Sequence, residues 1–133
     1  MLRSLSRYQD FGLLVLRLGL GVMFMLHGLP KIMGGPDKWH SLGAATAHVG
    51  IHFAPTLFGF LAALSEFGGG ICLIIGLAFR PACLMMCSTM VVASAMHLGT
   101  GDDLAKGASH AVELAFVFFG LATVGPGRYS VDK

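Results

Sequence analysis

The sequence predicts an all-α integral membrane protein: an antiparallel four-helix bundle whose N and C termini are both cytoplasmic. Three observations support this prediction. Of the 133 residues, 55% are hydrophobic and 12% are charged, whereas soluble domains typically carry about twice that share of charge. The mean hydropathy is +0.75. Four apolar segments approach the roughly 20 residues that a helix needs to cross a bilayer.

The predicted spans follow one another within a single domain that covers residues 1–133. They are residues 11–29, 56–79, 82–98 and 109–124. The last two are short, so some thinning of the bilayer around them is expected. Arg80 and Pro81 predict a tight hairpin between the second and third spans, because proline suits the first turn of a helix. Glycine-containing breaks that begin at Gly99 and Gly125 end the third and fourth spans.

An even number of spans places both termini on one side of the membrane. That side carries Arg3, Arg7, Arg80, Arg128 and Lys133, and the other side carries Lys31, Lys38 and Lys106. The excess of positive charge favours the cytoplasm for both termini. The loop over residues 30–55 is then external, and its stretch around Trp39 is expected at the interface or folded back against the bundle.

The first span lacks a small-x-small cleavage site, so we interpret it as a retained span rather than a signal peptide.

Charge and cysteine content narrow the function further. The formal net charge is +2 and no cluster of Lys or Arg is present, which argues against nucleic acid as a partner. The three cysteines lie inside apolar runs without a C-x-x-C pair: Cys72, Cys83 and Cys87. A structural disulfide is therefore not expected, whereas a buried thiol cluster stays open.

Polar residues inside the spans can be placed by depth, because an α-helix rises about 1.5 Å per residue. Glu66 falls almost at the midplane. Glu113 lies about 5 Å toward the outside, and Arg17 lies about 5 Å toward the cytoplasm. The histidines His27, His97 and His110 lie about 10 Å outward. Lys31, one turn beyond His27, could reach down to the same layer.

Helical periodicity places Glu66 and Arg17 on faces rich in small side chains. On the second span, one face carries Ala62, Glu66, Gly69, Gly70 and Leu73. The glycines let a neighbouring helix approach closely enough to pair with Glu66. On the first span, one face carries Arg17, Gly21, Phe24, Gly28 and Lys31. Small-residue faces such as Ala62, Gly69 and Gly76 could also contact a second copy of the chain, so a homo-oligomer stays open.

Charged residues within spans are expected to pair, because an ionised side chain at the bilayer centre costs on the order of 3 kcal/mol. One interpretation is an interior staple in which Arg17 bridges Glu66 and Glu113. One positive charge against two carboxylates leaves a negative charge for a proton, a protonated histidine, a metal ion or a substrate cation. The other interpretation is therefore a functional site, in which one carboxyl group accepts protons near neutral pH.

Other groupings point to metal or thiol chemistry. Cys83, Met86, Met90 and His97 share one side of the third span, and such a soft sulfur track could hold Cu(I). The same spacing is also typical of ordinary packing. His48 and His52 have i, i+4 metal-binding spacing if the external loop is helical. His110 and Glu113, three residues apart, can meet one ligand or each other, but they reverse the Glu-x-x-His order of di-iron bundles and do not support such a centre.

The chain resembles the DoxX family of small four-span membrane proteins. The stretches that carry the resemblance are "RLGLGVMFMLHGLPKIMGG", "SEFGGGICLIIGLAFRPACLMM" and "HAVELAFVFFGLATVGPGRYSVD". They match the family's Arg, His-Gly, Lys and Gly pair in the first span, its Glu, Gly-Gly, Gly-Leu and Arg at the second hairpin, and its closing span followed by Gly-Pro-Gly-Arg, Ser and Asp. The resemblance covers nearly the whole chain.

This resemblance implies a multi-pass protein of the bacterial cytoplasmic (inner) membrane that is linked to redox metabolism. The family includes a subunit of an archaeal thiosulfate:quinone oxidoreductase, and relatives act in oxidoreductase complexes or in metal and cofactor maturation. Carried onto this sequence, the family's polar positions within the spans are Arg17, His27, Lys31, Glu66, His97 and Glu113.

Three functional hypotheses follow. The first is a quinone-linked redox subunit in which Glu66 and Glu113 accept protons, His97 and His110 bind the quinone oxygens or relay protons, and Arg17 holds the carboxylates. The sequence shows neither a haem ligand pair nor a nucleotide-binding glycine fingerprint, so the electrons would come from a partner oxidoreductase. The second is a copper-type metal-binding, transport or maturation protein. The third is a non-catalytic membrane scaffold.

Overall fold

The computed structural model describes residues 2–101 and 108–132. All regular secondary structure in these residues is helical, which confirms the predicted all-α class. The elements are α1 (Leu2–Leu5), η1 (Ser6–Tyr8), α2 (Gln9–Met33), α3 (Gly35–Gly43), η2 (Ala44–Val49), α4 (Pro55–Ile75), α5 (Phe79–Gly99) and α6 (Ser109–Val124). Helices α2, α4 and α5 are long and apolar enough to cross a membrane, and α6 is a shorter apolar helix.

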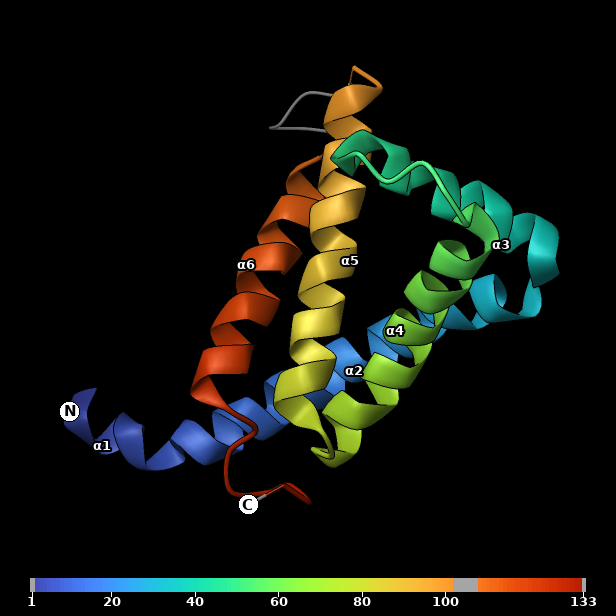
Figure 1. Cartoon of the computed structure of the whole chain (residues 1–133). Coiled ribbons are helices and arrows are strands. Elements are labelled where there is room, and N and C mark those ends of the chain that lie inside the picture. Colours follow the sequence, from blue (N-terminus) through green and yellow to red (C-terminus); the bar gives the residue numbers. More distant parts are fainter. Residues whose placement is uncertain (1, 102–107, 133) are drawn as a thin grey trace.

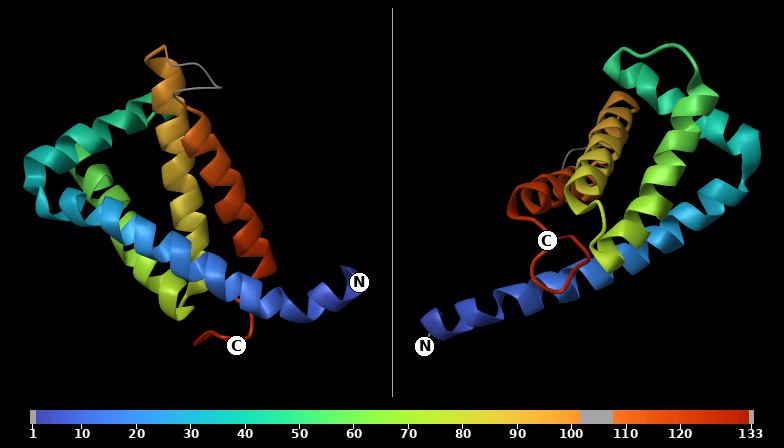
Figure 2. Two further views of the ribbon diagram at one scale, coloured as in Figure 1. Left: turned by 180° about the vertical axis from the view of Figure 1, so that it is seen from behind. Right: turned by 60° about the horizontal axis from the view of Figure 1, so that its bottom comes forward.

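The long helices form two packed pairs joined by a turn. Helices α5 and α6 lie side by side and antiparallel, whereas α4 diverges from α5 with distance from the turn that connects them (Figure 1). Helix α2 crosses α4 (Figure 2). Helix α3 packs against α4, and η2, which follows α3 in the chain, contacts the end of α5 that lies far from the α4–α5 turn. We call the end with the α4–α5 turn and both termini the hairpin end, and the opposite end the α3 end.

The α4–α5 turn lies earlier in the chain than predicted. Helix α4 ends at Ile75 rather than at 79, because Gly76 adopts a left-handed conformation with φ of 73° and caps the helix. Ala78 also has a positive φ, and α5 begins directly after it at Phe79. Pro81 therefore lies in the first turn of α5, as predicted. Helix α6 has the bounds that the sequence predicts.

The predicted external loop is largely helical and lies back against α4. Helix α3 approaches α4 at two glycines: Gly43 faces the backbone of Pro55, and Gly59 faces the backbone of Trp39. A Cβ at either glycine would collide with a main-chain carbonyl group. The close approach of the two backbones therefore depends on both glycines. Of the two positions predicted for this loop, the structure shows the one in which it folds back against the other helices.

Small residues also set the contact between α2 and α4. The buried residues of α2 are Arg17, Gly21, Phe24 and Gly28, the predicted face. Gly21 lies against the carbonyl oxygen of Gly70, and Gly28 lies against the backbone of Phe67. Gly69 packs on Met86, and Gly76 packs beside Ser130 and Arg17. These two glycines therefore pack inside the chain, and a contact of this face with a second copy stays a prediction.

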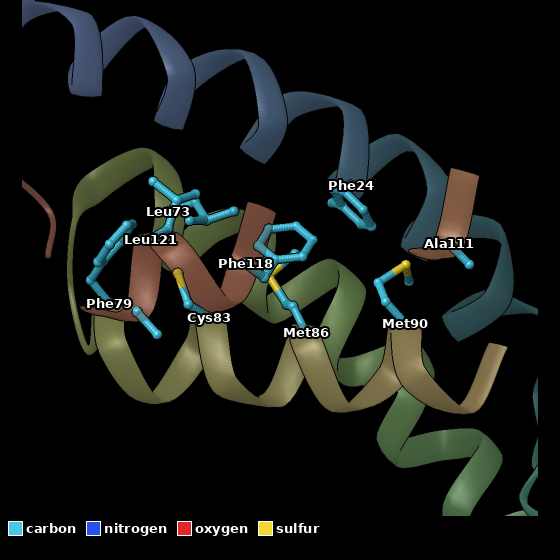
Figure 3. Close-up of a cluster of buried hydrophobic side chains, with 10 residues drawn as sticks. Phe24, Leu73, Phe79, Cys83, Met86, Met90, Ala111, Phe118 and Leu121 are labelled. Atoms are coloured by element: carbon cyan, nitrogen blue, oxygen red, sulfur yellow. The ribbon is translucent and has the colours of Figure 1, made fainter. Parts of the chain in front are cut away.

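The hydrophobic core lies between α5 and α6 and includes one buried side chain each from α2 and α4. In Figure 3, Phe79, Cys83, Met86 and Met90 follow one face of α5 toward α6. The remaining core residues are Phe24, Leu73, Ala111, Phe118, Leu121 and Ala122. Phe24 and Phe118 meet edge to face with ring centroids 5.1 Å apart. This contact links the α2–α4 pair to the α5–α6 pair.

Candidate functional site

Glu66 is paired with Lys31, toward the α3 end of the α2–α4 contact. Lys31 Nζ donates to Glu66 Oε1 at 2.9 Å and to Oε2 at 2.8 Å. The antiparallel packing explains the pair, because Gly28 lies against Phe67 and brings the next turn of α2 beside Glu66. The Glu66 side chain is 7% exposed and that of Lys31 is 31% exposed. The pair therefore combines a buried carboxylate with an ammonium group that is accessible at the surface of the protein.

Helix α3 supports this pair through Trp39. The indole Nε1 of Trp39 donates to the carbonyl oxygen of Lys31 at 3.0 Å. The indole ring also packs edge to face on Phe60 of α4, with centroids 4.8 Å apart. Trp39 thus ties α3 to both helices that carry the ion pair. The sequence pattern did not assign it a role, although it is the single tryptophan of the chain.

Arg17 does not bridge Glu66 and Glu113, so the predicted staple is wrong. The fully buried guanidinium donates instead to four backbone carbonyl oxygens: Leu73 at 2.9 Å, Ile74 at 3.0 Å, Pro126 at 3.2 Å and Tyr129 at 2.7 Å. The register of α2 on α4 places Arg17 beside the last turn of α4. Carbonyl groups there lack partners within the helix, so they compete successfully for the arginine.

Other charged residues at the hairpin end also bind the backbone. We call residues 125–132 the C-terminal strap. The Asp132 carboxylate accepts from the backbone N–H groups of Ala78 and Phe79 at 3.1 and 2.8 Å. Arg80 Nη1 donates to the carbonyl oxygens of Ala122 and Thr123, each at 2.9 Å. The strap thereby joins α2, α4, α5 and α6 at this end.

The other predicted site residues are not gathered around Glu66. Glu113 and His110 are exposed on α6, and His27 is exposed on α2 with its ring 6.0 Å from that of Phe24. His97 is half-buried near the end of α5. The predicted polar layer is therefore divided among separate helix faces, because packing is set by the glycine contacts rather than by the depth of the polar groups.

The sulfur track is part of the hydrophobic core. Cys83, Met86 and Met90 are buried against α6. In the part of the chain that the structure describes, no group of three or more His, Cys, Asp or Glu side chains could hold a metal ion. His48 lies in η2, which ends at Val49 and is followed by a left-handed Gly50, so His48 and His52 do not share a helix. The two histidines therefore do not form the metal-binding pair on one helix that their i, i+4 spacing suggested.

Two surface pockets lie away from the ion pair. One, of about 390 Å³, is at the hairpin end and is lined by Arg80, Pro81, Pro126, Gly127 and Asp132. The other, of about 170 Å³, is at the α3 end and is lined by residues that include His40, Thr46, His52 and Phe53. His40 Nδ1 lies 3.3 Å from the hydroxyl of Thr56.

Comparison with known proteins gives the chain a family. The DoxX family model matches residues 12–98, which include Arg17, Lys31 and Glu66. The chain belongs to the DoxX family. It is also similar to inner membrane protein YphA of Escherichia coli (strain K12), with 27% identity over 140 residues that cover 96% of each protein. No solved structure matches this DoxX protein.

The family and the helices agree on location. Three helices of this DoxX protein are long and apolar enough to span a membrane, and its relative YphA is an inner membrane protein. The predicted localisation, a multi-pass protein of the bacterial inner membrane, is confirmed.

Proposed function

We propose that this DoxX protein is a membrane subunit that binds a quinone at the Lys31–Glu66 pair and works with a partner oxidoreductase. The observation that carries the proposal is the ion pair, with Glu66 buried and Lys31 partly exposed. A lysine ammonium has three N–H donors, and Glu66 takes two of them. Among the described residues the third has no acceptor, which leaves it available for a quinone carbonyl oxygen that arrives from the lipid.

The chemistry of the pair suits a quinone. When a quinol is oxidised, two electrons pass to the partner oxidoreductase and its two O–H groups lose their protons. A carboxylate beside the bound oxygen is a suitable general base. Glu66 would accept the protons one at a time and release each to water on the exposed side of Lys31, which balances the reaction. Quinone reduction would use the same groups in reverse.

The proposal includes the arrangement of the chain in the membrane. Helices α2, α4, α5 and α6 form an antiparallel four-helix bundle, with the hairpin end in the cytoplasm and the α3 end outside. Arg80 and Arg128 at the hairpin end support this orientation, because positive charge is favoured on the cytoplasmic side. Lys31 then approaches Glu66 from the outer half of the membrane, and Glu66 itself lies near the midplane, a depth that a quinone head group dissolved in the lipid can reach.

Mass spectrometry of lipids that copurify from native membranes in mild detergent tests the proposal. We expect near-stoichiometric quinone with the wild-type protein. The variant Lys31→Met/Glu66→Gln removes both charges and leaves no unpaired ion, so it should fold but retain less than about a tenth of the quinone, as expected for the loss of a hydrogen bond to a charged donor. A folded double variant that retains its quinone would refute the assignment.

A second candidate function is a non-catalytic scaffold. The specific observation in its favour is Arg17, whose four hydrogen bonds all go to the backbone of the same chain. Under this alternative, the Lys31–Glu66 pair is a second internal connection. The double variant would then leave both the copurified lipids and the activity of any partner oxidoreductase unchanged.

A further inference from the structure

We propose that the outward face of α6 joins two copies of this chain in a parallel dimer, with Glu113 of each copy bound to His110 of the other. The face consists of His110, Glu113, Val117, Gly120 and Val124. The inference does not rest on quinone binding, because the face lies on α6 and the Lys31–Glu66 pair lies between α2 and α4.

The spacing of these residues is that of a helix–helix contact. They recur at intervals of three and four, the period that keeps one seam of a helix facing a partner helix. The buried residues of α6 are centred on a different side of the helix, toward α5, and Leu121 lies at the border between the two sides; they are Ala111, Phe118, Leu121 and Ala122. A Cβ at Gly120 would meet nothing within 4 Å. Gly120 therefore leaves room on the outward side for another helix to approach closely.

Glu113 makes this face unsuitable for lipid. It lies about 5 Å from the centre of α6 by the helical rise, which is within the hydrocarbon region if the helix spans the membrane. Intramembrane carboxylates nearly always face protein or a water-filled cavity. Glu113 is nevertheless exposed, and in the ranges that the structure describes no group is hydrogen-bonded or ion-paired to its carboxylate. Because an intramembrane carboxylate needs a polar or protein partner, the partner of Glu113 must come from outside this chain.

A second copy provides the complementary group. His110 lies on the same face as Glu113, one turn nearer the α3 end, and it too is exposed. In a contact with two-fold symmetry, any pair formed between the copies is formed twice. Two parallel α6 helices would bring each Glu113 beside the second copy's His110, about 4.5 Å further along the axis. The two carboxylates near the symmetry axis are then each bound by an imidazole donor.

Fluorescence energy transfer in liposomes tests the dimer. Protein labelled at the N-terminus is titrated over a range of protein-to-lipid ratios to give a dimer dissociation constant. We expect Glu113→Leu to raise this constant about tenfold, since two interhelical hydrogen bonds are lost. The exchanged variant His110→Glu/Glu113→His keeps the complementarity and should restore the constant to within about threefold of wild type. Thermal unfolding of each variant confirms that the monomer is folded.

Disulfide cross-linking locates the contact. Val117→Cys and Val124→Cys should form cross-linked dimers, whereas Met23→Cys on the exposed face of α2 should not; the wild-type protein controls for its own three thiols. The proposal is overturned if the wild type is monomeric at every ratio, or if Glu113→Leu dimerises as well as wild type. It is also overturned if the α6 cysteines are cross-linked to a different membrane protein and not to each other.

Discussion

At the hairpin end the charged side chains bind backbone groups, whereas at the α3 end Lys31 and Glu66 bind each other. Arg17 and Asp132 contact carbonyl or N–H groups of chain ends and turns. Such groups have no alternative partners when buried, so the contacts cannot be exchanged without disrupting the fold. A side-chain pair can exchange one partner for a ligand while both helices stay in place. The difference is why we propose a structural role for the charged residues of the hairpin end and a functional role for the pair at the α3 end.

The largest effect is expected from Arg17→Met. The substitution leaves the carbonyl groups of α4 and of the C-terminal strap without their donor, and hydrogen bonds to charged groups contribute enough that the four together imply a loss of about 5 kcal/mol. Unfolding in mixed detergent micelles should show this loss. Arg17→Lys is the control, and it should recover little because an ammonium group cannot match the planar guanidinium fork. Full recovery by lysine would contradict the geometry.

Next in size is Lys31→Met, which leaves the Glu66 carboxylate buried and unpaired. Removing one member of a buried ion pair costs about 3 kcal/mol or more. The double variant Lys31→Met/Glu66→Gln should regain most of this stability, because no uncompensated charge remains. The same unfolding assay measures both. If the double variant is as unstable as the single one, the fold at the α3 end needs its ion pair as much as the fold at the hairpin end needs Arg17. The proposed difference between the two ends would then be wrong.

A smaller effect is expected from Gly59→Ala, which separates α3 from α4. The added Cβ would collide with the Trp39 backbone, and forced separation of packed elements costs about 2 kcal/mol. Because Trp39 also donates to the carbonyl oxygen of Lys31, any quinone bound at the proposed site should copurify in smaller amount as well. Gly68→Ala is the matched control, since its Cβ would meet only ordinary packing against Leu64. Equal effects of the two substitutions would show that helix propensity, rather than α3 packing, is responsible.

The smallest effect is expected from Asp132→Ala. The Asp132 carboxylate caps the start of α5 through the N–H groups of Ala78 and Phe79, and loss of such a cap costs about 1 kcal/mol. Limited proteolysis should also cleave the C-terminal strap faster, since its anchor is lost. Asp37→Ala, at an exposed position in α3, should leave strap cleavage unchanged. Unaltered cleavage in Asp132→Ala would mean that the Arg17 contacts and the backbone hydrogen bonds of Val131 and Asp132 hold the strap without the Asp132 carboxylate.

Some of the site could be predicted from the sequence and some could not. Periodicity identified the face of α2 that carries Arg17 and Lys31, and the glycine-rich face of α4 that carries Glu66. Depth alone then suggested that Arg17 and Glu66 should meet. The structure places them apart, because depth gives the position of a residue along its own helix and says nothing about backbone carbonyl groups that compete for the same donor.

The sequence by itself determined the all-α class, the apolar helices and the faces on which they pack, because these follow from composition and from the helical repeat. Only the tertiary structure decided which charges pair. The register between α2 and α4 is set where Gly28 meets Phe67, and this contact brings Lys31 rather than Arg17 to Glu66. The outward direction of Glu113 depends likewise on how α6 packs on α5. Such choices depend on contacts between residues far apart in the chain, which no local pattern records.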